Sequence, residues 1–277
     1  MNKILEVKHL KVFPLNEPNR LLVKDISFEL YPGRITCIVG ESGSGKSLSA
    51  LSIMKLLSHQ LKQTGDILFQ GKNISNLSDD AIRSLRGKSI SMIFQEPMTS
   101  LNPVLTIGDQ IKESLSAHLK LNDQLLRNKV TSLLKEVGIP SERMSCYPDE
   151  LSGGQRQRVM IAMSIACKPS ILIADEPTTA LDVTVQSQIL KLLQSLKNEM
   201  HMTMLFITHD FGVVEDIADE VIVMFQGKIV EKGSVSQVLK KPKHPYTKAL
   251  LQCVPDAKGI KKLKPIEYQH LGHQMSF

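Results

Sequence analysis

Residues 40–47 read Gly-Glu-Ser-Gly-Ser-Gly-Lys-Ser, which fits the Gly-x-x-x-x-Gly-Lys-Ser/Thr pattern of a phosphate-binding loop. A short apolar run ends just before the loop and a helical stretch, residues 48–57, follows it, as such a loop requires. Glycine lets backbone N–H groups approach phosphate oxygens, and the start of the helix adds positive potential. We expect the Lys46 ammonium to neutralise phosphate oxygens and the Ser47 hydroxyl to bind Mg²⁺. The expected phosphate-contacting residues are Gly40, Glu41, Ser42, Gly43, Ser44, Gly45, Lys46 and Ser47.

Two adjacent carboxylates, Asp175 and Glu176, follow the apolar run 171–174. Ligands of an open α/β sheet bind at the carboxyl ends of its strands, so these side chains are expected at a ligand site. Adjacent residues point in different directions, which suits two roles: Asp175 as a Mg²⁺ ligand and Glu176 as the general base that polarises the attacking water. A strand that ends in acidic residues also fits a solvated turn. The phosphate-binding loop in the same chain favours the catalytic interpretation.

Short apolar runs at 34–39, 90–94, 171–174 and 204–207 predict strands that are buried on both faces, as in a central parallel sheet. Residues 185–200 predict an amphipathic helix, and strands alternating with helices indicate a layered α/β core. Residues 107–137 have no convincing strand but show apolar side chains at helical spacing, which predicts a helical insertion. Residues 21–23 and 26–30 have β character, and Gln226-Gly227 predicts a hairpin turn.

A second glycine-opened helix start lies at residues 151–157, Leu-Ser-Gly-Gly-Gln-Arg-Gln. Ser152 and the N–H groups of Gly153 and Gly154 can bind a phosphate there, helped by the helix dipole. We call such a phosphate-binding helix start a cradle. One phosphate needs only one cradle, so a second cradle in the chain suggests that it binds the nucleotide of another subunit. In this order the motifs resemble the ATP-binding cassette (ABC) ATPases, whose signature is Leu-Ser-Gly-Gly-Gln and includes Gln155.

The resemblance implies roles for four further residues. Gln95 matches the glutamine that contacts Mg²⁺ and the water and senses a transmembrane partner, and Asp182 matches the loop that crosses the dimer interface. His209 matches the histidine that contacts the γ-phosphate. Phe13 stands where the adenine-stacking aromatic is expected, but the inserted residues 14–20 blur the register. A core or surface phenylalanine therefore stays an equal alternative.

The same resemblance implies the fold class: α/β, with a P-loop NTPase (RecA-like) core, an N-terminal antiparallel β subdomain and an all-helical insertion subdomain. It covers a nucleotide-binding domain at residues 1–240, with the helical subdomain at about 98–167. Residues 241–277 are interpreted as a short C-terminal appendage with a helix around 246–251.

Residues 94–103, 175–186 and 244–251 are similar to the ATPase subunits of dipeptide/oligopeptide/nickel importers. This implies ATP and Mg²⁺ as cofactors, two transmembrane permease subunits, a second homologous ATPase, an extracytoplasmic binding protein and a peripheral position at the cytoplasmic face of the membrane. Peptides are the expected cargo, with nickel or a metal chelate as the alternative; whether the ATPase pair is homo- or heterodimeric stays open. Longer peptide-importer ATPases continue into a cysteine-rich tail that can hold an iron–sulfur cluster. No cysteine follows Cys253 here, so no cluster is expected.

The composition excludes several classes. The chain of 277 residues has no apolar run that could span a membrane, and its start has no long apolar stretch, so we expect no secretory signal. Its four scattered cysteines indicate reduced thiols. A net charge of +6 by itself admits nucleic acid as a partner, and some ABC ATPases act on DNA or ribosomes. The DNA-acting relatives insert a long coiled coil before the signature and the translation-type relatives carry two cassettes. This chain has neither feature, so we expect transport and no nucleic acid partner; import is favoured over export because exporters often fuse a membrane domain to the cassette.

Overall fold

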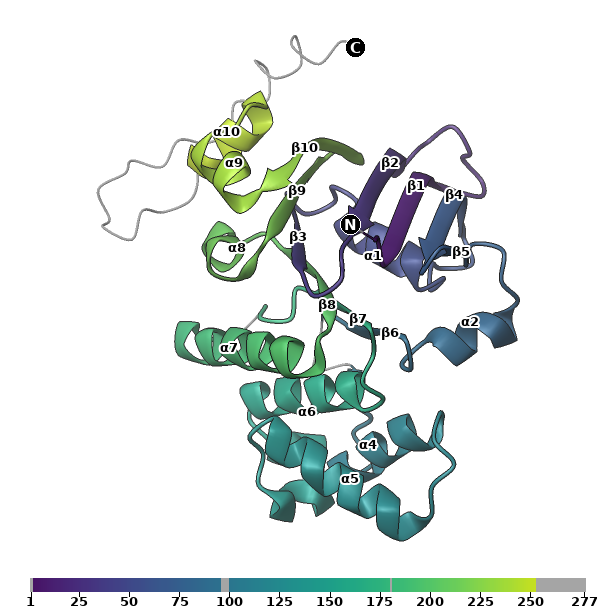
Figure 1. Cartoon of the computed structure of the whole chain (residues 1–277), viewed down its shortest axis with the longest axis vertical. Coiled ribbons are helices and arrows are strands. Elements are labelled where there is room, and N and C mark those ends of the chain that lie inside the picture. The colour runs from purple at the N-terminus through teal and green to yellow at the C-terminus, as the bar shows by residue number, and fades with distance from the viewer. Residues whose placement is uncertain (1, 96–99, 180, 253–277) are drawn as a thin grey trace.

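The computed structural model describes residues 2–95, 100–179 and 181–252, and its centre is a mixed β-sheet with the strand order β10-β9-β3-β8-β7-β6 (Figure 1). The strands from β9 to β6 run parallel, and β10 returns antiparallel to β9. The predicted buried strands are therefore confirmed, as is the hairpin turn at residues 226 and 227. The strands of this sheet are β3 (Ile35–Val39), β6 (Ile90–Ile93), β7 (Ile171–Asp175), β8 (Thr203–Thr208), β9 (Glu220–Phe225) and β10 (Lys228–Ser234).

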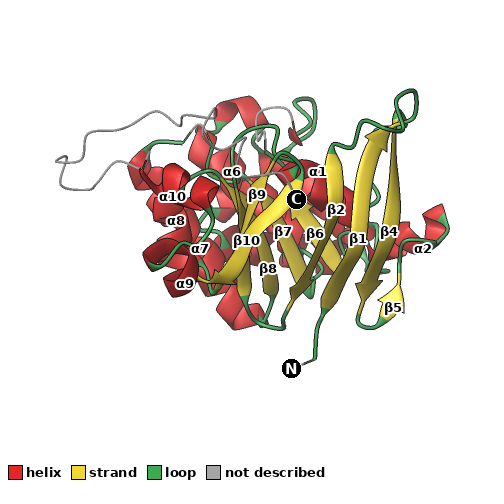
Figure 2. Ribbon diagram, turned by 90° about the horizontal axis from the view of Figure 1, so that it is seen from above, coloured by secondary structure: helices red, strands yellow, loops and turns green. Residues whose placement is uncertain are grey.

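A second, antiparallel sheet with the order β2-β1-β4-β5 confirms the predicted N-terminal β subdomain. Its strands are β1 (Leu5–Pro14), β2 (Val23–Leu30), β4 (Leu61–Phe69) and β5 (Lys72–Asn73). Figure 2 shows β2 beside β10, where the two sheets meet, and the Lys24 N–H donates a hydrogen bond to the Gly227 carbonyl oxygen at 2.7 Å. The antiparallel sheet is thereby anchored to the turn between β9 and β10.

The helices lie around the central sheet, and α4, α5 and α6 gather at the far end from the antiparallel sheet (Figure 1). This group confirms the helical insertion. The helical elements are α1 (Lys46–Ile53), α2 (Asp79–Leu85), α4 (Ile107–Ser116), α5 (Asp123–Glu136), η1 (Ser141–Ser145), η2 (Pro148–Glu150), α6 (Gly153–Ile165), α7 (Val183–Met200), α8 (Phe211–Ile217), α9 (Val235–Lys240) and α10 (Pro245–Gln252). Helix α1 ends at Ile53, four residues before the predicted end, because Lys55 adopts a left-handed backbone conformation.

The absence of hydrophobic alternation in the central strands follows from burial on both faces. Side chains such as Ile38 and Ile173 pack on the face shared with α1 and the antiparallel sheet. Their neighbours Cys37 and Leu172 pack on the opposite face, with α6, α7 and the helical subdomain. Burial of each large apolar side chain is worth about 1.5–3 kcal/mol, so the sheet is held rigidly from both sides. Its strand ends can therefore position functional groups precisely in space.

The start of the predicted C-terminal appendage belongs to the core. Tyr246, in the first turn of α10, has an exposed fraction of 0% and packs its ring against Phe225 at a centroid distance of 4.1 Å. The division at residues 240 and 241 stays a prediction, and Cys253 with the rest of the tail lies outside the described residues. Cys37, Cys146 and Cys167 are free thiols, as expected. In the part of the chain that the structure describes, no helix has the length and apolarity to cross a membrane.

Candidate functional site

The phosphate-binding loop connects the buried end of β3 to α1. Gly40 must lack a side chain, because a Cβ atom there would lie 2.2 Å from the carbonyl oxygen of Met224. The Ser44 hydroxyl is buried and has no hydrogen-bond partner among the described residues. A buried hydroxyl without a partner is costly unless a ligand supplies one. This unpaired group, beside the first N–H groups of α1, fits a loop that receives phosphate oxygens.

Lys46 is held inside the loop by its backbone carbonyls. Its Nζ atom donates to the carbonyl oxygens of Gly40 and Glu41, each at 2.8 Å, and the residue is 5% exposed. Burial lowers the pKa of Lys46, and the charges of Glu176, Asp175 and Glu41 oppose that shift. The ammonium is thus desolvated and bonded to neutral carbonyls, a state in which an incoming phosphate gains a strong interaction.

Ser47 and Asp175 meet across the site. The Ser47 hydroxyl donates to Asp175 Oδ1 at 3.1 Å, although 128 residues separate the two in the chain. Asp175 is 4% exposed, and burial raises its pKa, with the Glu176 charge adding to the shift and the Ser47 hydrogen bond and Lys46 opposing it. The Ser47 hydroxyl oxygen and the buried Asp175 carboxylate are suitable ligands for a hard cation such as Mg²⁺. This ion takes most of its remaining ligands from phosphates and water.

Glu176 is contacted by side chains from three segments. Its Oε2 atom accepts from Thr179 Oγ1 at 2.9 Å and from Gln95 Nε2 at 3.2 Å, and it lies 3.3 Å from His209 Nδ1. The structure therefore brings together all three predicted catalytic residues, Glu176, His209 and Gln95. Thr179 was not predicted, although a hydroxyl three residues after an acidic residue is a local signal for such a contact.

The backbone of Glu176 is strained. Its φ of 46° lies in the left-handed region, which costs a residue with a side chain about 1–2 kcal/mol. The Glu176 N–H is bonded to the carbonyl oxygen of Ile207 in the neighbouring strand at 2.9 Å, which holds this conformation. Strain of this kind is retained where the surrounding fold imposes it, and it is typical of functional positions.

The signature residues form the N-terminal cap of α6. The Ser152 hydroxyl accepts from the Gln155 N–H at 3.3 Å, and the Gln155 side chain accepts from the Ser152 N–H at 3.0 Å. Gly154 packs against α7, since a Cβ there would lie 2.6 Å from Val185 Cγ1. None of the hydrogen bonds found for Ser152 and Gln155 within the described ranges reaches the phosphate-binding loop. Both cradles are present in one copy of the chain, and these hydrogen bonds do not join them.

Asp182 and Phe13, two further residues predicted for the nucleotide site, lie at the start of α7 and in β1. Asp182 caps α7, because its carboxylate accepts from the Val185 N–H at 2.9 Å, and it is exposed. Phe13 is half-buried in β1, where it pairs with Lys62 of β4. Nothing among the described contacts tests whether Phe13 stacks on a base, so both alternatives for this ring stay open.

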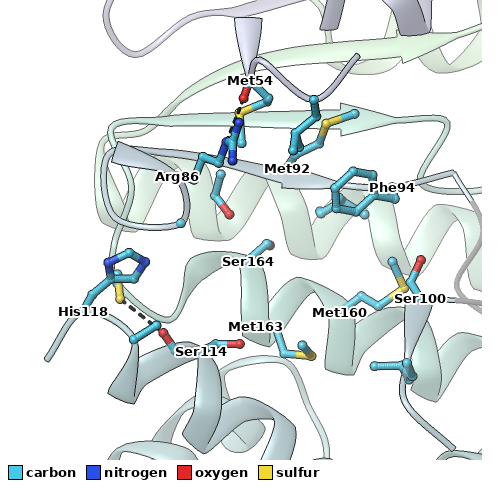
Figure 3. A pocket seen from close by; sticks show the side chains of 17 residues that line it. Met54, Arg86, Met92, Phe94, Ser100, Ser114, His118, Met160, Met163 and Ser164 are labelled. Carbon is cyan, nitrogen blue, oxygen red and sulfur yellow. Dashed lines mark hydrogen bonds between the residues drawn. The ribbon is translucent and has the colours of Figure 1, made fainter. Parts of the chain in front are cut away.

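A groove of about 370 Å³ runs between the edge strand β6 and the helical subdomain (Figure 3). Met92 and Phe94 line it on the strand side, and Met160 and Met163 of α6 line it opposite. Phe94, 42% exposed, comes directly before Gln95. One peptide bond therefore joins the groove to Gln95, which contacts Glu176.

Comparisons with known proteins agree with this geometry. The family model described as "ABC transporter" matches residues 23–179, and the model described as "Oligopeptide/dipeptide transporter, C-terminal region" matches residues 230–273. The first match contains the phosphate-binding loop, the signature and both carboxylates. The second contains most of β10 and all of α9 and α10, and it continues into residues that the structure does not describe.

Curated relatives cover most of the chain. The dipeptide transport ATP-binding protein DppD of Bacillus subtilis is 49% identical, over 96% of this chain and 82% of its own length. The peptidoglycan transport ATP-binding protein YejF of Agrobacterium fabrum is 53% identical, over 91% of this chain and 47% of its own. The glutathione import ATP-binding protein GsiA of Escherichia coli is 48% identical, over 94% of this chain and 43% of its own. The chain thus spans less than half the length of the last two.

Solved structures share the fold. The ATP-binding cassette MJ0796, in a dimeric post-hydrolysis state bound to ADP and Pi, gives a TM-score of 0.75 at 28% identity, over 83% of this chain and 98% of that one. The structure of cbiO1 from Clostridium perfringens, described as part of the ABC transporter complex cbiONQ, gives a TM-score of 0.76 at 28% identity, over 100% of both chains. These likenesses confirm the predicted α/β cassette fold.

Proposed function

The chain belongs to the ABC transporter family, and we propose that it is the ATP-hydrolysing subunit of an importer for di- and oligopeptides. The observation that carries the catalytic part is the cluster around Glu176: a carboxylate at the end of β7, next to Asp175 and contacted by Gln95, Thr179 and His209. Peptides as cargo are supported by the C-terminal family match and by relatives named for dipeptide and glutathione transport.

In the proposed reaction the phosphate-binding loop and Lys46 bind the phosphates of ATP, and Glu176 accepts a proton from the attacking water. His209 donates a hydrogen bond to the terminal phosphate, and Gln95 orients the water. Ser47, Asp175 and Gln95 would hold Mg²⁺, which neutralises phosphate charge when it is bound. The facing oxygens of Ser47 and Asp175 fit that ion.

We further propose that two cassettes associate head to tail around ATP. In this dimer the loop of one subunit faces Ser152, Gly153 and Gly154 of the other, and Asp182 lies at the interface. Separate phosphate cradles within one chain support the arrangement, and the similar cassette MJ0796 is dimeric. Nucleotide at the interface favours the closed state, and hydrolysis removes that preference. The second cassette is proposed to be a homologous chain.

The remaining partners are proposed to be two transmembrane permease subunits and, indirectly, an extracytoplasmic binding protein. The groove along β6 offers the permease an apolar docking site with Phe94 and Met163 exposed to it. Its direct connection to Gln95 gives a physical path from the permease to the catalytic cluster. The chain would then be peripheral, at the cytoplasmic face of the membrane.

Glu176→Gln in the assembled transporter tests the catalytic assignment. The substitution keeps the shape of the side chain and removes the base, so ATP turnover is expected to fall at least 100-fold while ATP still binds. Unchanged turnover would show that another group takes the proton. Gln124→Glu, in the exposed start of α5, is the control: it makes the reverse replacement, an amide by a carboxylate, and is expected to keep full turnover.

The cargo is tested on the cognate binding protein, since a cassette does not touch it. Binding of short peptides measured by calorimetry, against Ni²⁺ and a nickel chelate as competitors, separates the two classes. Peptide binding supports the proposal. Binding of nickel or its chelate alone would replace the cargo and leave the ATPase assignment intact.

A further inference from the structure

The first turn of α10 touches the phosphate-binding loop. The Glu41 N–H, at the second position of the loop, donates a hydrogen bond to the phenolic oxygen of Tyr246 at 3.2 Å, across 205 residues of sequence. The Tyr246 side chain is fully buried, and its ring packs on Phe225 with an angle of 35° between the planes. A buried, packed ring holds its hydroxyl in one place, so it can hold the loop as well.

The same region supports the loop from a second point. The Gly227 N–H, in the turn between β9 and β10, donates to the Ser44 carbonyl oxygen at 3.1 Å. Phe225, which supports the Tyr246 ring, comes two residues before Gly227. Glu41 and Ser44 are thus both held from the C-terminal side of the chain, and residues 42 and 43 between them form the exposed part of the loop.

A carboxylate fixes the start of α10. Glu231, on β10, accepts hydrogen bonds from the backbone N–H groups of Lys243 at 2.7 Å and His244 at 3.0 Å. His244 Nδ1 in turn accepts from the Tyr246 N–H at 3.1 Å. The N–H groups at the start of a helix are therefore satisfied by a negative charge and a ring nitrogen, an arrangement that stabilises helix starts. Tyr246 is positioned by this network.

We propose that Tyr246 is a positioning residue for nucleotide binding, whose hydroxyl holds the phosphate-binding loop in the shape that receives the phosphates. The proposal rests on the function proposed above and extends it to the C-terminal segment, residues 244–246. A preformed loop loses less conformational freedom when ATP binds. The loop contacts the phosphates in the ground state and in the transition state alike, so loss of this order weakens ATP binding and leaves the chemical step unchanged.

The test is Tyr246→Phe in the assembled transporter, with ATP hydrolysis measured over a range of MgATP concentrations. The variant keeps the packed ring and removes the acceptor of the Glu41 N–H. KM for MgATP is expected to rise roughly 2- to 10-fold, the size of one hydrogen bond, with kcat within about 2-fold. Tyr31→Phe, at the half-buried turn before β3, is the matched control and is expected to leave both constants unchanged.

An unchanged KM, or a loss of kcat at constant KM, would overturn the proposal. MgATP affinity of the full chain, measured by calorimetry, separates it from the proposed function. If the wild-type chain binds MgATP but does not hydrolyse it, the proposed ATPase function is wrong. The MgATP affinities of the wild type and of Tyr246→Phe would still decide the role of Tyr246.

A double-mutant cycle tests the route through Glu231. Glu231→Ala removes the acceptor of two N–H groups at the start of α10 and is expected to weaken MgATP binding by a comparable factor. If Glu231 acts through Tyr246, the double variant binds about as well as the weaker single variant. Multiplying effects would show that Tyr246 does not transmit the contribution of Glu231, and would overturn this route.

Discussion

His209 Nδ1 lies 3.3 Å from Glu176 Oε2, an oxygen that also accepts hydrogen bonds from Gln95 and Thr179. The four side chains come from the segments that follow β6, β7 and β8, three adjacent strands of the central sheet. Glu176 is 13% exposed and His209 is 63% exposed. A largely buried carboxylate is therefore in contact with side chains from three segments, and a change in any one of them alters the surroundings of Glu176, the proposed catalytic base.

Thr179→Val is the direct test of that relationship, because valine keeps the shape and removes the shortest hydrogen bond to Glu176. A hydrogen bond to a charged group contributes about 1.5–3 kcal/mol, so kcat is expected to fall roughly 10-fold or more, with KM for ATP little changed. Steady-state ATP hydrolysis by the assembled transporter measures both. Thr131→Val is the control, because Thr131 is half-buried in α5 and its hydroxyl donates to the helix backbone at Arg127. A variant with wild-type kcat would show that Thr179 does not help to hold the base.

Ser47→Ala tests the proposed Mg²⁺ site. The substitution removes the hydroxyl that faces Asp175, so ATP affinity in the presence of Mg²⁺ is expected to fall about 10-fold, while affinity in EDTA stays the same. Calorimetric titrations with and without Mg²⁺ give the two values. Ser52→Ala is the control within α1, since the Ser52 hydroxyl bonds only the helix backbone at Leu48 among the described contacts. Equal losses with Mg²⁺ and in EDTA would remove Ser47 from the ion site.

The parts of the site that were predictable are those whose chemistry is local in sequence. The loop at residues 40–47 and the pair Asp175 and Glu176 are contiguous motifs next to buried strands, so pattern and position are sufficient to find them. Tyr246 is different, because its contact with Glu41 depends on where the β9–β10 hairpin and α10 pack. The predicted end of α1 is wrong. The apolar pattern continues to residue 57, but the helix ends at Ile53 and Lys55 adopts a left-handed backbone conformation.

The sequence itself suggests that the second phosphate cradle serves a nucleotide of another subunit, because one phosphate needs only one cradle. The local pattern at Ser152 predicts a helix cap, which the structure confirms. It does not show whether the cap faces the loop of its own chain or that of another. The structure adds that, among the described residues, the hydrogen bonds of the Ser152 cap stay within the start of α6 and do not reach the phosphate-binding loop of the same chain.

Gly154→Ala tests why the signature has a second glycine. The added Cβ would lie 2.6 Å from Val185 Cγ1, a distance that forces α6 and α7 apart, so the free energy of unfolding is expected to fall by about 1–3 kcal/mol. Gly153→Ala is the matched control, because its nearest neighbour would be Leu181 at an ordinary 3.8 Å. Urea unfolding of the full chain measures both. Adding Val185→Ala should restore part of the loss; equal stability of the two single variants would contradict the packing argument.

The start of α10 gives the chain a pH dependence of known sign. Burial lowers the pKa of His244, and the Glu231 charge offsets part of that shift. Burial alone would raise the pKa of Glu231, but the hydrogen bonds it accepts at the start of α10 outweigh burial and lower it. Both groups therefore bind more protons in the unfolded chain than in the folded chain. Their contributions to stability are present above the unfolded values and are lost as the pH falls.

For His244 this loss begins below its usual value of 6.5, and for Glu231 it begins below 4.5. The free energy of unfolding of the full chain, measured in urea from pH 7.5 to 5.0, is expected to fall more steeply for the wild type than for His244→Asn. Asparagine can still accept from the Tyr246 N–H but does not titrate, so the substitution removes the proton and keeps the hydrogen bond. His59→Asn, in an exposed loop, is the control for replacing a histidine elsewhere in the chain. Parallel curves for the wild type and His244→Asn would mean that His244 has the same pKa in the folded and unfolded chains, and the start of α10 would then not be sensitive to pH through this residue.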